Sequence, residues 1–132
     1  MVRQIIAAGR QFHADDIPLD WAVLVTRMGS PLLRKTLESL LRHHHHSPAE
    51  LRRLAAARDM EAVRMLAHRR RGAAGLLAAG PAVRAAESLE TGIRCKRMLD
   101  LAAVETLAGA LESLLAEAEH YLACVSGEAV LQ

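Results

Sequence analysis

Apolar residues recur at intervals of three and four between residues 101 and 122, in the stretch LAAVETLAGALESLLAEAEHYL. An α-helix has 3.6 residues per turn, so this spacing gathers the apolar side chains on one face. That face comprises Leu101, Val104, Ala108, Leu111, Leu115, Ala118 and Leu122. Asp100 supplies a capping carboxylate at the start, and Gly127 is expected to close the helix. An apolar face of this length must be covered by other elements, which the rest of the chain has to supply.

The chain before Asp59 predicts a short helical segment and then a longer one that proline interrupts. Residues 17–28 form a short apolar segment ended by Gly29, in which Trp21 and Leu24 are expected to pack over one end of the fold. The pair Ser30-Pro31 has the cap and first-turn proline of a helix start. Ser47 and Glu50 have the spacing of a capping box around Pro48, so the helix either kinks or restarts there.

Two more helical segments complete the chain up to the long C-terminal one. Asp59 can cap a helix that reads MEAVRMLAHRRRGAAGLLAA, and the Gly80-Pro81 pair breaks it. The next segment covers roughly residues 82–97. Hydrophobic residues make up 52% of the chain, mostly as Ala and Leu, and aromatics only 2%, which favours helices over strands.

These segments predict an all-α fold, an antiparallel up-down-up-down four-helix bundle with a short extra N-terminal helix. Short connections between amphipathic helices make antiparallel neighbours the economical packing. The bundle is expected to cover residues 17–127, with residues 1–16 as a tail or linker and residues 128–132 as a C-terminal tail.

Several classes of partner and compartment are disfavoured by composition. A formal net charge of +2 gives no argument for nucleic acid. No apolar run reaches the roughly 18–20 residues of a membrane span, and no signal peptide is recognisable, so we expect a cytoplasmic domain. Cys95 and Cys124 are expected to be free thiols.

The consecutive residues His43–His46 point in different directions on a helix and cannot all ligate one ion, so no metal site is predicted.

The helix after Asp59 carries the residue with the clearest chemistry, His68. On a helical wheel, Val63, Leu66, Ala73 and Leu77 form the expected core face, and His68 lies opposite it. A histidine on the core face would usually be a satisfied packing residue, but His68 is expected to face solvent. Its imidazole has a nitrogen that is nucleophilic near neutral pH.

The residues around His68 are unusual for an ordinary surface. Gly72 and Gly75 lie on its face, and each interior glycine costs a helix about 1 kcal/mol relative to alanine. The absence of Cβ atoms there would let another protein approach the imidazole closely. Arg64 and Arg71 lie one turn to either side and could bind the oxygens of a phosphoryl group by charge-assisted hydrogen bonds.

The stretch AHRRRGAAG, residues 67–75, resembles the signature of histidine-containing phosphotransfer domains. In this resemblance His68 is the phosphoacceptor, Arg71 the basic residue three positions on, and Gly72 the glycine that follows. The SLE sequence at residues 88–90 is similar to the end of the family's next-helix motif. Arg70 departs from the pattern, because the family usually has an apolar residue there. Either its stem lies along the core with its head reaching out, or the helix is rotated or locally distorted.

The resemblance implies a phosphorelay intermediate that accepts a phosphoryl group on His68 from a receiver-domain aspartate and passes it to a response regulator. Its partners would be receiver domains, of response regulators or of a hybrid sensor histidine kinase. The Mg²⁺ would belong to the receiver, and the chain would need no cofactor of its own. Arg69 would join the docking surface of Gly72 and Gly75. No nucleotide-binding motif is present, so no autonomous kinase activity is expected.

Two alternatives stay open. One is a non-catalytic helical interaction module, a degenerate phosphotransfer domain in which His68 is never phosphorylated; Arg70 is the feature that supports it. The other is the dimerisation and phosphoacceptor domain of a sensor kinase. That domain has an acidic residue directly after its histidine, where this chain has Arg69. A monomer is therefore expected.

Overall fold

The computed structural model describes the backbone of residues 19–131 and the side chains in that range except those of residues 22 and 126–131. Within this range α-helices are the regular secondary structure and there is no strand, which confirms the all-α prediction. The expected tail, residues 1–16, lies outside the described residues. The helices are α2 (Trp21–Met28), α3 (Ser30–His44), α4 (Ser47–Ala56), α5 (Met60–Leu76), α6 (Gly80–Lys96) and α7 (Leu101–Leu131).

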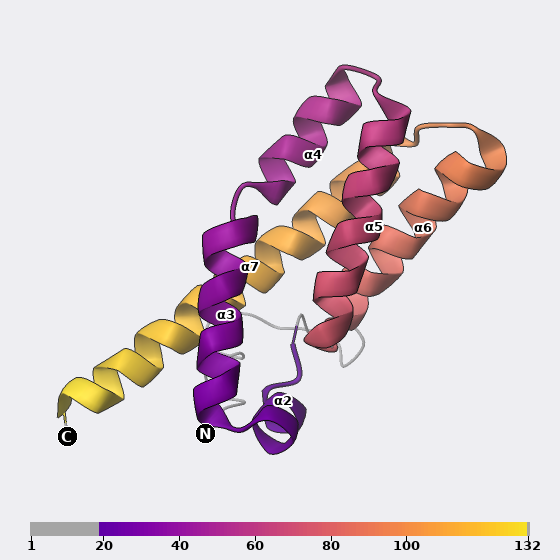
Figure 1. The fold of residues 1–132 in the computed structure, drawn as a ribbon. Helices are drawn as coiled ribbons and strands as arrows, with labels where there is room; N and C mark the ends of the chain where they lie inside the picture. The colour runs from indigo at the N-terminus through magenta and orange to yellow at the C-terminus, as the bar shows by residue number, and fades with distance from the viewer. Residues whose placement is uncertain (1–18, 132) are drawn as a thin grey trace.

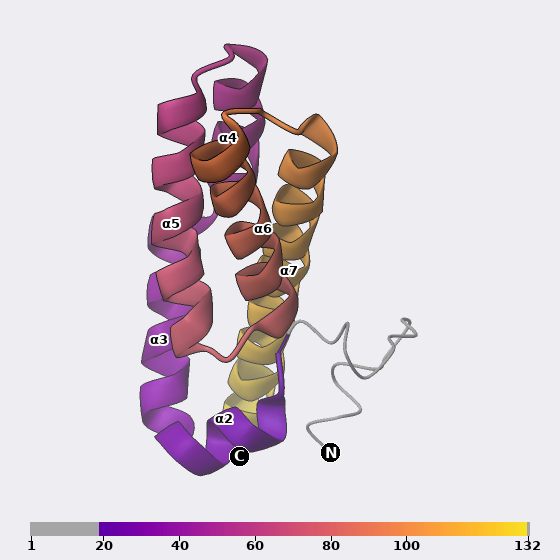
Figure 2. The same ribbon diagram turned by 90° about the vertical axis from the view of Figure 1, so that its right-hand side faces the viewer.

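The helices pack as the predicted up-down-up-down bundle (Figure 1). The first long helix is in two pieces, because α3 and α4 follow one another in the same direction before α5 turns back. Helix α7 packs against α3, α4 and α6, and α5 packs against α4 and α6. The short N-terminal helix α2 contacts α3 and lies across one end of the bundle (Figure 2).

The break between α3 and α4 falls at residues 45 and 46, so the helix restarts. The predicted capping box does not form there. His46 is the N-cap residue and makes no side-chain cap hydrogen bond, while Ser47 is already helical and buried. Glu50 instead accepts a hydrogen bond of 2.6 Å from Arg53. Ser30 is likewise inside its helix, because Gly29 is the cap and its φ of 77° suits glycine.

Three aspartates begin helices by accepting backbone hydrogen bonds, which satisfies N–H groups that have no partner inside the helix. Asp59 accepts from the amide of Ala62, and Asp100 accepts from that of Ala102, as predicted. Asp20 does the same for α2. The prediction that Gly127 closes the last helix is wrong, since α7 continues to Leu131. Glycine weakens a helix interior without necessarily ending it.

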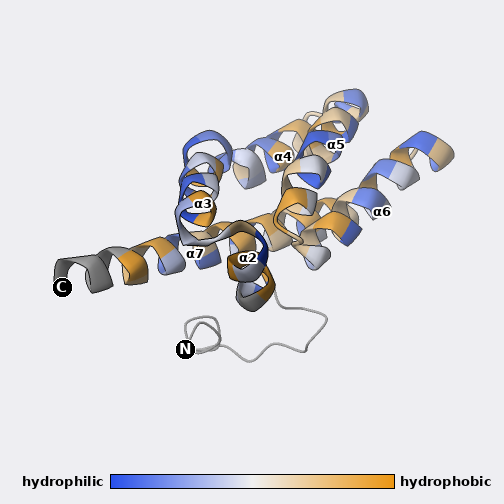
Figure 3. Ribbon diagram, turned by 60° about the horizontal axis from the view of Figure 1, so that its bottom comes forward, coloured by the Kyte–Doolittle hydropathy of each residue, from blue (hydrophilic) through white to orange (hydrophobic). Residues whose placement is uncertain are grey.

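The core runs along the middle of the bundle, and each helix turns a hydrophobic side inward and a hydrophilic side outward (Figure 3). On α7 the buried face includes Leu107, Leu114 and Tyr121 in addition to most of the predicted stripe, whereas Leu101 is exposed. Trp21 is buried and stacks on Tyr121, with ring centroids 4.6 Å apart. Leu24 is buried as well, so α2 closes the end of the bundle as expected.

Candidate functional site

Helix α5 places His68 on the surface, as predicted, with 53% of its side chain exposed. The buried face of the helix is rotated from the expected one. Val63 and Leu77 are fully buried, but Ala67 and Ala74 complete this face, while Leu66 and Ala73 are only half-buried. The reason is that α5 is covered on two sides, by α4 and by α6, so its core face is centred between them.

A buried carboxylate holds the ring of His68. Nδ1 of His68 lies 2.8 Å from Oε1 of Glu90, whose side chain is only 5% exposed. Glu90 lies on the core face of α6, the helix against which α5 packs most extensively. An ionised carboxylate can only accept hydrogen bonds, so Nδ1 is the protonated nitrogen of the ring in this arrangement. Nε2 then carries the lone pair.

The guanidinium of Arg71 lies beside His68 and Glu90. Its guanidinium is 3.5 Å from Oε2 of Glu90 and 3.5 Å from Nδ1 of His68. Oε2 of Glu90 accepts no hydrogen bond within the described residues. Arg71 therefore provides positive charge next to a carboxylate that is largely removed from water, and such a carboxylate is costly without a partner. With 37% of its side chain exposed, the same guanidinium also borders the imidazole surface.

Arg64, the second predicted basic residue, pairs with Glu61 on its own helix. The hydrogen bonds between them lower the pKa of Glu61 and raise the pKa of Arg64. Arg64 thus lies one helical turn before His68, but its guanidinium pairs with Glu61. Arg69 is exposed on the neighbouring face of α5.

Gly72 and Gly75 are exposed and leave the face of α5 beyond His68 open. A Cβ atom built on either residue would meet no other heavy atom within 4 Å. Packing among the described residues therefore requires neither glycine. Gly72 lies in the interior of α5, where glycine lowers helix stability, whereas Gly75 lies in the last turn of the helix.

Glu90 is the residue of this candidate site that the sequence did not predict. The sequence contained two signals for it. It lies in the SLE stretch, and it occupies the apolar face of its helix together with Ala86, Leu89 and Ile93. A carboxylate among buried apolar residues needs a partner, and that partner could have been sought on the facing helix.

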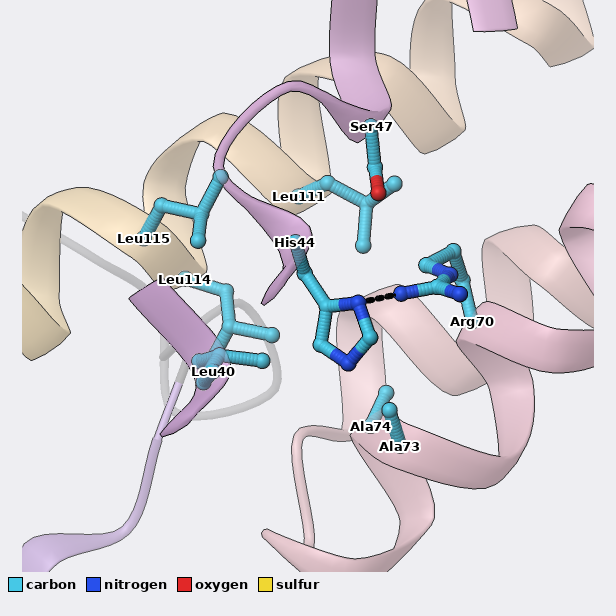
Figure 4. Close-up of a pocket in the computed structure, with 9 residues that line it drawn as sticks. All are labelled: Leu40, His44, Ser47, Arg70, Ala73, Ala74, Leu111, Leu114 and Leu115. Carbon is cyan, nitrogen blue, oxygen red and sulfur yellow. Dashed lines mark hydrogen bonds between the residues drawn. The ribbon is translucent and has the colours of Figure 1, made fainter. Parts of the chain in front are cut away.

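Arg70 lies half-buried on the core side of α5, and its guanidinium contacts Nδ1 of His44 (Figure 4). This location agrees with the expectation that its stem follows the core. Of the four consecutive histidines, His44 is the one turned inward, and the others are exposed. No group of three His, Cys, Asp or Glu residues within the described part of the chain is placed to hold a metal ion.

No family model matches this chain, and no similar protein is found among curated proteins or solved structures.

No helix in the described range has both the length and the apolar character needed to span a membrane. Cys95 and Cys124 are free thiols.

Proposed function

We propose that this chain is a histidine phosphotransfer domain that carries a phosphoryl group on Nε2 of His68. The observation that carries the proposal is the pairing of an exposed imidazole with the buried carboxylate of Glu90, 2.8 Å from Nδ1. This pairing fixes the ring tautomer and its orientation. It also leaves the nucleophilic nitrogen accessible to a partner protein.

The proposed transfer exchanges one bond to phosphorus for another. The Nε2 lone pair attacks the phosphorus of an aspartyl phosphate on a receiver domain, the P–O bond to that aspartate breaks, and the aspartate leaves as a carboxylate. The Nδ1 proton stays on the ring, which therefore becomes positively charged. Glu90 accepts the hydrogen bond from that proton and stabilises the charge. The reverse attack by another receiver's aspartate returns the ring to its starting state.

The surface around His68 fits a protein partner. Gly72 and Gly75 remove side chains on one side of the imidazole, and Arg69 and Arg71 add positive charge that complements an acidic receiver pocket. The receiver would supply the Mg²⁺. We propose a monomeric, cytoplasmic domain that receives its phosphoryl group only from a partner and belongs to a phosphorelay.

The test is transfer of labelled phosphoryl groups from phosphorylated receiver domains in the presence of Mg²⁺. Wild-type protein should acquire acid-labile, base-stable label, and His68→Gln should acquire none. Glu90→Gln keeps an acceptor for the Nδ1 proton but loses the charge, so transfer should slow by roughly 10- to 100-fold, the value of a hydrogen bond to a charged group.

Two outcomes would contradict this proposal. Label on both wild type and His68→Gln would place the phosphoacceptor elsewhere, and residues His43–His46 would be examined next. A folded wild-type protein that binds receivers but never acquires label would indicate the non-catalytic interaction module.

A further inference from the structure

Helix α5 is covered unevenly on the side that faces the first long helix, which α3 and α4 form. Residues spaced three or four apart lie on this side, because that spacing returns to the same face of a helix. They are Ala62, Leu66, Arg69, Ala73 and Leu76. The first three lie beside α4, whereas the last two lie beside α3. Helix α3 is not among the helices that pack closely on α5, and Figure 1 shows the two apart. The C-terminal end of α5 is therefore without a close neighbour on this side.

The space between α3 and the end of α5 is a hollow of about 320 Å³ with an apolar floor. The buried side chains of Leu40 and Leu77 form that floor. On the α5 rim, Leu76 is 76% exposed, more than any other large hydrophobic side chain in the described part of the chain. On α3, Leu32 is also exposed and lies one turn before Thr36, which lines the hollow. Single exposed leucines are ordinary, but an apolar floor between exposed leucines is a surface suited to a partner.

A second hollow lies between α4 and α5, and most of its charged side chains are basic. Its basic residues are His43, His46, Arg69 and Arg70. Its one acidic residue, Glu50, pairs with Arg53. Lys35 adds a cation at the wall of the first hollow. No carboxylate among the described residues lies within ion-pair distance of Lys35 or Arg69. The described residues therefore do not compensate the positive charge along this side of α5.

The two hollows follow one another along α5. The contact between His44 and Arg70 lies between them, since His44 lines the first hollow and Arg70 the second (Figure 4). The α5 residues of the first hollow fall within 73–77, and those of the second within 62–70. The centres of these ranges are about nine residues apart, which an α-helix spans in roughly 13 Å. A helix lying along this side of α5 would therefore reach both hollows with side chains two to three turns apart.

We propose that the two hollows together bind an amphipathic α-helix of another protein, with large apolar side chains at one end and Asp or Glu two to three turns away. A hollow bordered by two helices accepts a third helix by the same packing that joins helices within a bundle. An extended segment would instead need an exposed strand edge, and the described residues form no strand. The uncompensated cations favour an acidic helix and disfavour a basic one.

This site is distinct from the phosphoacceptor and goes beyond the proposed function. Arg69 and Ala73 lie about 100–140° around α5 from His68, since successive residues of a helix turn by about 100°. His68 instead contacts Glu90 on α6. Binding of the helix should therefore not depend on phosphorylation of His68.

The probe is a synthetic peptide of about 16 residues, held helical by a side-chain staple on its far face, because a free helix of this length is marginal in water. It carries Leu at positions i and i+4 and Glu at i+8 and i+11, which lie on one face. A second peptide carries Gln in place of both Glu residues. Calorimetry measures binding to the full chain, and amide NMR shifts locate it. The shifts should centre on residues 32–46 and 62–77.

Leu76→Ala should weaken binding of the Glu peptide about tenfold or more, because the Leu76 side chain changes from exposed to buried in the complex. Met98→Ala is the matched control, since Met98 is 60% exposed but lies between α6 and α7. It should bind the peptide as wild type does. Lys35→Gln should weaken binding up to about fivefold, and less at high salt, whereas Lys96→Gln on α6 should have no effect. All four side chains are exposed, so the variants should keep the wild-type melting temperature.

His68→Gln should bind the Glu peptide as tightly as wild type, so a failure of phosphoryl transfer and a failure of this site are separate results. A wild-type chain that binds neither peptide, or binds both equally well, overturns the proposal. So do shifts centred on His68 and Gly72, which would place the helix on the phosphoacceptor face. A wild-type dimer in sedimentation that Leu76→Ala converts to a monomer would assign the apolar hollow to a second copy of this chain, which also contradicts the proposal.

Discussion

Replacing Gly72 with alanine should change stability and phosphoryl transfer in opposite directions. Gly72 lies in the interior of α5, and an added Cβ would meet no atom within 4 Å. The substitution therefore gains helix propensity of about 1 kcal/mol without steric cost inside the chain. For a domain of this size, that gain corresponds to a rise in melting temperature of about 3–5 °C. If a receiver approaches this face closely, the new methyl group overpacks the interface by about 1–3 kcal/mol, which slows transfer roughly 5- to 150-fold.

The assay pairs thermal unfolding with the transfer rate from a phosphorylated receiver, and Gly109→Ala is the matched control. Gly109 also lies inside a helix with open space at its Cβ, but it is on α7. It should stabilise the fold while leaving transfer unchanged. A Gly72→Ala protein that is more stable and transfers at the wild-type rate would refute the idea that this glycine is retained for close docking. A less stable Gly72→Ala protein would refute the propensity argument.

Three further substitutions test the fold. Asp59→Ala removes the acceptor for the Ala62 amide and should lower the free energy of unfolding by about 1 kcal/mol in chemical denaturation. Trp21→Ala leaves Tyr121 without its stacking partner and should cost about 3–5 kcal/mol in the same assay. Arg52 hydrogen-bonds Glu105 and Glu112, and its hydrogen bond lowers the pKa of Glu112. A lowered carboxyl pKa stabilises the fold above the pKa of the unfolded chain, so Arg52→Met should lower the melting temperature at pH 7. The difference should shrink as the pH falls through the pKa of folded Glu112; a pH-independent difference would contradict this assignment.

Local signals in the sequence predicted the helices and two of their caps, because the interactions involved span only a few residues. Asp59 and Asp100 cap the helices that follow them regardless of what packs nearby. The capping box at Ser47 failed because tertiary packing buried that residue inside α4, and because Arg53 engaged Glu50. The same packing rotated the core face of α5, so that Leu66 is only half-buried.

In the candidate site, too, the sequence predicted features of a single helix but not contacts between helices. Exposure of His68 followed from its position on one helix, and so did the open face at Gly72 and Gly75. The contact with Glu90 could not follow from spacing alone, because it joins two helices across 22 residues of sequence. Likewise, Arg64 was expected near a phosphoryl group, but a carboxylate one turn away on the same helix holds its guanidinium.

Burial of Glu90 is costly in the resting domain, and the proposed chemistry explains why a carboxylate is suited to this position. Its Oε2 atom accepts no hydrogen bond within the described residues, and Arg71 approaches it only to 3.5 Å. A neutral imidazole donating from Nδ1 compensates the carboxylate incompletely. Phosphorylation on Nε2 would make the ring cationic, and the contact would become a true ion pair in a partly dry environment. The carboxylate would thus stabilise the phosphorylated ring more than the free one. A neutral amide does not favour a cationic ring over a neutral one. Glu90→Gln should therefore shift the phosphoryl-transfer equilibrium from His68 toward the receiver aspartate, even where the protein remains folded and the ring keeps its orientation.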